Sequence, residues 1–149
     1  MAIQVAVIGS GAENESRAEE VGRLLAERGV TVVCGGLFEV MEGAARGAKE
    51  AGGTTIGVLP GETRREASPW IDHPVVTGLG HGRNLAVAAS GDGVIAVGGS
   101  WGTLAEIAFA KLLGRPVVVV EPGWEIEDVD RVATPEEAVD YVMRAVVDA

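Results

Sequence analysis

The strongest constraint on the fold of this chain is the glycine-rich stretch 98–106, which reads Gly-Gly-Ser-Trp-Gly-Thr-Leu-Ala-Glu. The apolar run Val94–Val97 precedes it, and the run Leu104–Leu113 follows it without a helix breaker. This order predicts a buried strand that passes through a glycine turn into the start of a helix. Backbone N–H groups at a helix start lack partners and carry the positive end of the helix dipole, and glycines let an anion approach them. We therefore expect a phosphate-binding turn, with Glu106 in the helix that follows.

The rest of the chain repeats this pattern of strand, turn and helix. Strands are expected at Ile3–Ile8, Val30–Cys34, Thr54–Leu59, Pro74–Thr77, Gly93–Val97 and Val117–Val120. Helices are expected before Gly29, at Phe38–Ala51, at Gly80–Ser90, at Leu104–Leu113 and after Thr134. Apolar strands that alternate with helices indicate a parallel sheet covered on both faces. Right-handed crossovers then predict one doubly wound, Rossmann-like α/β domain over residues 1–149, with six or seven strands and a ligand crevice at their carboxyl ends.

Three of these strands end in glycine turns, at 9–11, 35–36 and 98–102. In a parallel sheet the carboxyl ends of the strands share one edge, so the three turns are predicted to line one crevice. Glycines in such turns also serve geometry alone, because the turn needs positive φ angles. The predicted phosphate-binding residues are Gly9, Ser10, Gly11, Gly35, Gly36, Gly98, Gly99, Ser100, Trp101, Gly102 and Thr103, together with Asn84.

Glu106 has two interpretations. Three helix starts carry the spacing of a capping box, at Ser16–Glu19, Thr103–Glu106 and Thr134–Glu137, and no glycine cradle precedes the last of them. Spacing alone therefore does not make Glu106 functional. Its apolar neighbours on both sides predict a carboxyl group on a largely buried helix that faces the crevice, and we favour this functional role.

A second candidate, Arg83, lies just after the predicted fourth strand, in the stretch Gly80–Asn84. An arginine near this edge of the sheet can hold a phosphate or a sugar oxygen with its fork of donors, although a surface salt bridge is an equal alternative. The irregular segment 61–73 contains Arg64 and Arg65 and is longer than most connections, so we expect either a lid or a solvated excursion.

Composition excludes several functional classes. The net charge of −10 leaves no basic surplus for nucleic acid. One cysteine and two histidines do not supply a metal site, and the two lysines do not form a P-loop. The turn at 9–14 lacks the third glycine of a dinucleotide fingerprint, which disfavours NAD. The N-terminus lacks a basic leader, and no apolar run reaches about 18 residues, so we expect a cytoplasmic protein without membrane contact.

These motifs resemble the LOG-like family of nucleotide-binding, Rossmann-type proteins, which includes cytokinin-activating phosphoribohydrolases and molybdenum cofactor carrier proteins. The family pattern PGGxGTxxE is similar to residues 98–106, with Val97 in place of the proline. A glycine run followed by GLMG is echoed at 35–43, and the HxRK motif is similar to residues 81–84, with Asn84 in place of the lysine. The resemblance covers essentially the whole chain.

The resemblance implies that Arg83 and Glu106 are a catalytic pair that hydrolyses a nucleoside 5′-monophosphate to free base and ribose 5-phosphate. Asn84 and Val97 instead favour the branch with molybdenum cofactor carriers, and so a non-enzymatic carrier or sensor. Either role implies a phosphorylated small-molecule ligand, with a nucleotide and the molybdenum cofactor as the alternatives, no required cofactor, and a homodimer or larger homo-oligomer. The base, the activity and the number of subunits stay open.

Overall fold

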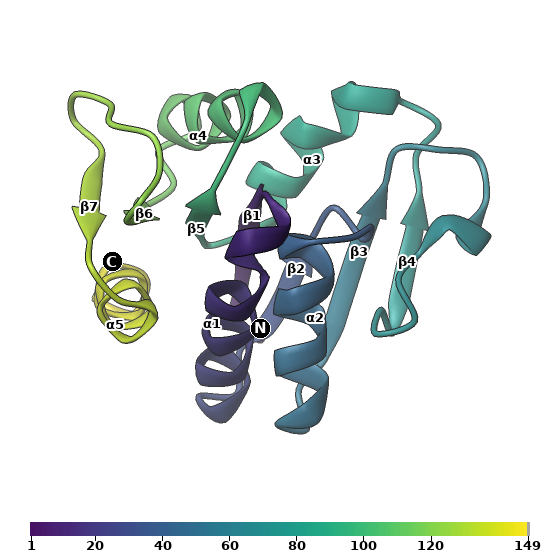
Figure 1. Cartoon of the computed structure of the whole chain (residues 1–149), viewed down its shortest axis with the longest axis horizontal. Helices are drawn as coiled ribbons and strands as arrows, with labels where there is room; N and C mark the ends of the chain where they lie inside the picture. Colours follow the sequence, from purple (N-terminus) through teal and green to yellow (C-terminus); the bar gives the residue numbers. More distant parts are fainter. Residues whose placement is uncertain (149) are drawn as a thin grey trace.

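The computed structural model describes residues 1–148 and places seven strands in one parallel sheet. The strands are β1 (Gln4–Ser10), β2 (Thr31–Cys34), β3 (Thr55–Leu59), β4 (His73–Val76), β5 (Gly93–Gly98), β6 (Val117–Val120) and β7 (Asp130–Val132). Their order across the sheet is β4-β3-β2-β1-β5-β6-β7, and every neighbouring pair is parallel (Figure 1). The order reverses between β1 and β5, which confirms the doubly wound, Rossmann-like prediction.

Five α-helices cover the two faces of this sheet. They are α1 (Glu15–Glu27), α2 (Val40–Glu50), α3 (Arg83–Ser90), α4 (Trp101–Leu112) and α5 (Pro135–Val147). Each face of the sheet has its own hydrophobic core, and alternate residues of β1 point into one or the other. Val5 and Val7 pack with α1, α2 and α5, whereas Ala6 and Ile8 pack with α3 and α4 (Figure 1). A central strand that is buried on both faces must be apolar throughout, which is why the first strand was recognisable from its sequence.

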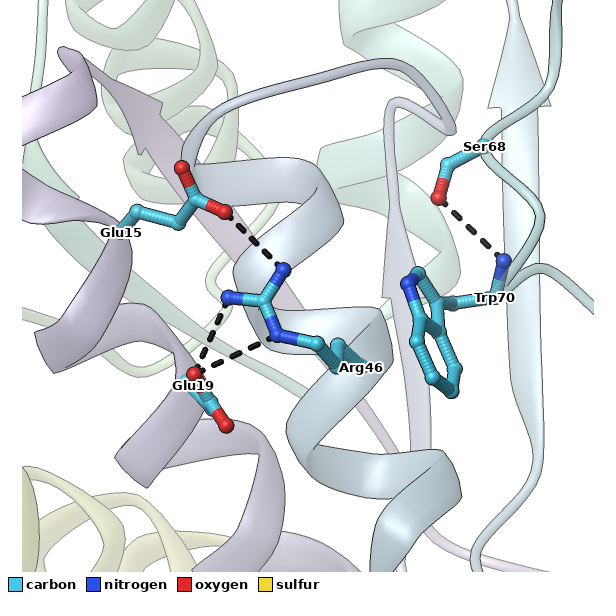
Figure 2. A network of polar contacts seen from close by, with 5 residues as sticks. All are labelled: Glu15, Glu19, Arg46, Ser68 and Trp70. Carbon is cyan, nitrogen blue, oxygen red and sulfur yellow. Dashed lines mark hydrogen bonds and ion pairs between the residues drawn. The ribbon is translucent and has the colours of Figure 1, made fainter.

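Helices α1 and α2 pack against each other at very short range. A Cβ atom on Gly47 would lie 2.0 Å from the backbone oxygen of Glu19, so only glycine allows this approach. Arg46 of α2 then bridges to Glu15 and Glu19 of α1, with nitrogen–oxygen distances of 3.0 Å to each (Figure 2). The predicted Ser16–Glu19 capping box is therefore wrong: α1 begins at Glu15, and Glu19 binds across to α2 instead.

The segment 61–73 is held against the sheet rather than extended into solvent. It contains a short 3-10 helix, Arg64–Glu66, and the Ser68 amide donates to the Gly36 oxygen at 2.9 Å. The Ser68 hydroxyl in turn accepts from the Trp70 amide at 3.3 Å (Figure 2). These contacts tie the middle of the segment to the β2–α2 turn. Residues 62–65, with Arg64 and Arg65, are exposed, so this first part of the segment is solvated.

The edges of the sheet differ most from the expectation. Strand β7, with the sequence Asp-Arg-Val, has no apolar run and was missed, because an edge strand does not need one. Strand β4 contains Pro74, which an edge strand tolerates. Within residues 1–148, no helix is long and apolar enough to cross a membrane.

Candidate functional site

A pocket of about 200 Å³ lies where the strand order reverses, between the carboxyl ends of β1 and β5. Open parallel sheets bind ligands at this position. Nine of the predicted residues line it: Gly9, Ser10, Gly35, Arg83, Asn84, Ser100, Gly102, Thr103 and Glu106. Five others, Gly11, Gly36, Gly98, Gly99 and Trp101, do not line it.

The turn between β5 and α4 forms one wall of the pocket. Gly98 and Gly99 have φ angles of 65° and 137°, which explains two glycines in succession. Helix α4 then begins at Trp101, and the Thr103 hydroxyl accepts from the Ser100 amide at 3.3 Å. The N-cap and first turn of α4 thus border the pocket at Ser100, Gly102 and Thr103, at the end of the helix that favours an anion.

This helix start also decides between the two interpretations of Glu106. Because Ser100 is the N-cap, Thr103 is the third residue of α4 and Glu106 lies in its second turn. Glu106 therefore cannot cap the helix, and the capping-box interpretation of Thr103–Glu106 is wrong. The spacing misled because Thr103 serves as the partner of a cap one turn earlier, and not as a cap itself.

The Glu106 side chain is buried in the pocket, with 7% of its surface exposed. Among residues 1–148 no group donates a hydrogen bond to its carboxyl group. Burial raises the pKa of Glu106 to about 8, and the positive charge of Arg83 partly offsets this rise. The carboxyl group thus holds a proton at neutral pH and can donate it, which is the property of a general acid.

Arg83 is buried as well, with 9% of its surface exposed, so the surface salt bridge considered for it is wrong. Its side chain fits beneath Gly35, where a Cβ atom would lie 2.8 Å from an Arg83 Nη atom. One Nη atom donates to the Asn84 Oδ1, and the other lies 4.0 Å from the Met41 sulfur. The buried Nε has no hydrogen-bond partner in the described part of the chain. Each Nη makes one contact and carries two N–H groups, so Arg83 keeps donors for a ligand.

Asn84 connects this arginine to the β5–α4 turn. It is only 4% exposed, and its Nδ2 would lie 3.4 Å from a Cβ atom on Gly102. The residue in the position of the family's lysine is thus a buried neutral amide that holds Arg83 in place.

The two other glycine turns are largely closed. In the β1–α1 turn, Gly9 and Ser10 line the pocket, but the Gly11 amide donates to the Glu39 carboxylate at 2.8 Å. In the β2–α2 turn, the Gly36 amide donates to the Cys34 sulfur at 3.4 Å. The turn before α4 contributes three lining residues, Ser100, Gly102 and Thr103, from the N-cap and first turn of the helix.

The predicted site does not include four of the lining residues, Val7, Ile8, Met41 and His81. It also missed Asn14, whose Nδ2 donates to the Ser10 oxygen at 2.8 Å and supports the β1–α1 turn from behind. Asn14 carries no recognisable signal, because its role depends on contacts across the fold.

Trp101 was predicted to bind the ligand, and it lies outside the pocket. Its side chain is 78% exposed and packs beside Trp124, with ring centroids 5.5 Å apart. The Trp124 indole donates to the Ser100 oxygen at 3.1 Å. The two rings therefore brace the β5–α4 turn from its outer side.

Comparison with known proteins places this site among relatives. A family model described as the SLOG cluster4 family matches residues 2–146. The cytokinin riboside 5′-monophosphate phosphoribohydrolase of Mycobacterium tuberculosis is 33% identical over 131 residues, covering 82% of this chain and 70% of that protein. The chain is therefore similar to a phosphoribohydrolase over most of its length.

Two solved structures are similar over the full length. The molybdenum cofactor binding protein from the phototrophic bacterium Rippkaea orientalis has a TM-score of 0.91 and 31% identity, covering 99% of this chain and 98% of that one. The molybdenum cofactor (Moco) carrier protein from Chlamydomonas reinhardtii has a TM-score of 0.89 and 34% identity, covering 100% of both chains.

Proposed function

Because the chain belongs to the SLOG cluster4 family, which is LOG-like, we propose that it binds a phosphorylated small molecule with its phosphate on the first turn of α4. The observation that carries the proposal is the juxtaposition of that helix start with a buried arginine that keeps an unpartnered donor. Phosphate favours both partners, since helix N-termini attract anions and guanidinium groups bind phosphate through paired donors. Glu106 then faces the part of the ligand next to the phosphate.

A carrier role fits this geometry best, with a nucleotide or the molybdenum cofactor as cargo. Asn84 occupies one Arg83 nitrogen, which fixes the guanidinium for binding. Two molybdenum cofactor-binding proteins are similar to the chain from end to end, which supports the same role. The pocket of about 200 Å³ is below the ~300–1,000 Å³ typical of whole-ligand sites. We infer that it encloses the phosphorylated end and leaves the ring system outside.

Thermal unfolding with adenosine 5′-monophosphate and, separately, with molybdenum cofactor tests this role. A ligand at about 100 times its dissociation constant adds about 2.7 kcal/mol to the stability of the folded state. Arg83→Met should weaken binding about tenfold or more, because a charged hydrogen bond is lost. Arg65→Met is the matched control, because Arg65 is exposed and does not line the pocket. A wild-type protein that neither compound stabilises would contradict the proposal.

Hydrolysis of a nucleoside 5′-monophosphate is the second candidate, and the raised pKa of Glu106, about 8, favours it. Water would add to C1′ of the ribose while the bond from C1′ to the base breaks and leaves its electron pair on the base. Glu106 would protonate the departing base and regain a proton from the attacking water. Arg83 would hold the phosphate, and the products would be the free base and ribose 5-phosphate.

Release of free base from a panel of nucleoside 5′-monophosphates tests this reaction. General acid catalysis typically contributes about 100- to 10,000-fold, so Glu106→Gln should reduce the rate by at least about 100-fold. Arg65→Met again serves as the control and should leave the rate unchanged. Equal release by the wild type and Glu106→Gln would exclude this role of Glu106, whereas binding without release would leave the carrier role standing.

We also propose that α4 contributes to a homo-oligomer. Its outer side borders an apolar groove of about 450 Å³, lined by Leu104, Ile107, Ala108, Lys111, Leu112, Ile126, Glu127, Asp128 and Val129. Leu112 is 83% exposed there. Sedimentation equilibrium should give a mass above that of one chain, and Leu112→Asp should lower it. A wild-type protein that sediments as a monomer would contradict the proposal.

A further inference from the structure

Glu39 has a backbone conformation that a non-glycine residue rarely adopts. Its φ and ψ angles are 59° and −120°, just before the first residue of α2. A residue with a side chain adopts a positive φ angle only at an energetic cost. Such strained residues persist where the surrounding structure holds them, and they often lie at functional sites. The strain directs attention to what the Glu39 side chain does.

That side chain reaches the first glycine turn, where its Oε2 accepts the Gly11 amide at 2.8 Å. Glu39 lies in the chain between Gly35 and Met41, which both line the pocket, and Gly11 follows Ser10, which also lines it. Glu39 and Gly11 do not themselves line the pocket, so the carboxylate lies at its rim, one residue beyond the lining residue Ser10.

We propose that Glu39 is a specificity-determining residue that takes the place of a second anionic group and restricts the ligand to one phosphate. The inference rests on the proposed function, since it presupposes a phosphate on the first turn of α4. It adds that the other glycine turn already holds an anion, supplied by the protein.

Hydrogen-bond accounting supports this role. The Gly11 amide donates to Glu39 and the Gly36 amide donates to the Cys34 sulfur, so neither turn has that donor available for a ligand. A second phosphate would have to displace the Glu39 carboxylate or lie beside it. Two negative charges at the rim of one pocket repel each other, and this repulsion is screened little at distances below about 8–10 Å.

The strained backbone of Glu39 argues against a purely structural role for this residue. Glycine at position 39 would adopt the same backbone angles without cost, and a water molecule would satisfy the Gly11 amide, which is not buried. What glycine and water do not supply is the negative charge. The charge is thus the feature of Glu39 that an experiment must remove by itself.

Two variants of Glu39 and one control variant test the effect of its negative charge. Glu39→Gln keeps an acceptor for the Gly11 amide and removes the charge. Glu39→Gly removes charge and acceptor and also relieves the backbone, so it provides a folded variant even if Gln distorts the turn. Glu50→Gln removes one charge from the other end of the same helix, away from the pocket, and is the matched control.

The experiment is calorimetric titration of each protein with adenosine 5′-monophosphate and adenosine 5′-diphosphate, with EDTA present so that no cation masks the second phosphate. In the wild type we expect the monophosphate to bind at least about tenfold more tightly than the diphosphate, a difference of about 1.4 kcal/mol. Glu39→Gln and Glu39→Gly should remove most of this preference by strengthening diphosphate binding, whereas Glu50→Gln should leave it unchanged.

The outcomes separate the two proposals. If the wild type binds the monophosphate and the preference is absent, or persists in both Glu39 variants, the role of Glu39 is overturned and the phosphate site stands. If Glu50→Gln relaxes the preference as much as the Glu39 variants do, net charge is the cause and Glu39 has no special role. If neither compound binds any of the four proteins, the role of Glu39 in choosing between nucleotides is overturned, whereas the phosphate site is then judged by the molybdenum cofactor experiment above.

Discussion

The β1–α1 turn and the β5–α4 turn leave neighbouring strands at the same edge of the sheet, and both contain glycines with positive φ angles. The β5–α4 turn lines the pocket with the N-cap and first turn of α4. The β1–α1 turn passes through a short 3-10 helix, and the Gly11 amide is held by Glu39. Glycines in the sequence therefore indicate where the backbone turns. Whether a backbone amide in such a turn is free to bind a ligand depends on residues elsewhere in the chain.

The largest expected effect concerns the interlocking of these two turns. A Cβ atom on Gly98 would lie 2.0 Å from the Asn14 side-chain Nδ2 and 2.8 Å from the Ser10 backbone oxygen. Gly98→Ala should therefore lower the free energy of unfolding by about 3–5 kcal/mol, through backbone strain and overpacking together. Gly29→Ala is the control, because Gly29 also has a positive φ but no atom within 4 Å, and should cost about 1–2 kcal/mol. Equal losses in urea unfolding would show that the turns are independent.

The next effect concerns the pH dependence of stability that the buried Glu106 causes beside the β5–α4 turn. Since burial raises the pKa of Glu106 from 4.5 to about 8, the folded state retains a proton that the unfolded state releases. Stability should therefore fall as the pH rises from about 4.5 to about 8 and level off above that range. Glu106→Gln should lose this part of the pH dependence and be more stable than the wild type by up to about 5 kcal/mol at pH 9. Parallel stability curves for the two proteins between pH 5 and pH 9 would contradict the assignment.

The smallest expected effect is the loss of stability when a threonine at the start of α4 or α5 is replaced. The Thr103 hydroxyl accepts from the Ser100 amide at the open turn, and the Thr134 hydroxyl accepts from the Glu137 amide at the start of α5. Thr103→Val and Thr134→Val should each cost about 1 kcal/mol of stability. Only Thr103→Val should weaken adenosine 5′-monophosphate binding, because Thr134 lies outside the pocket. A comparable loss of binding in Thr134→Val would mean that the effect comes from general loosening.

Much of the fold and part of the site could be predicted from local patterns. The buried strands and the Thr134 cap were recognisable because each is encoded within a few consecutive residues. Edge strand β7 was not, because solvent on one side relaxes the demand for apolar residues. The capping spacings at Ser16 and Thr103 failed for a related reason: the same four-residue pattern occurs inside a helix and at its start.

By itself, the sequence determined the parallel sheet and the glycine turn before α4, because hydrophobic periodicity and glycine placement act over short stretches of chain. Only the tertiary structure decided which amides stay open. Gly11 is bound by a residue 28 positions away, and Arg83 is held beneath Gly35 on another strand end. Burial by elements far apart in the sequence likewise moves the pKa of Glu106 to about 8. Hydrogen-bond partners and dielectric environment are properties of the assembled fold, and no four-residue pattern in the sequence encodes them.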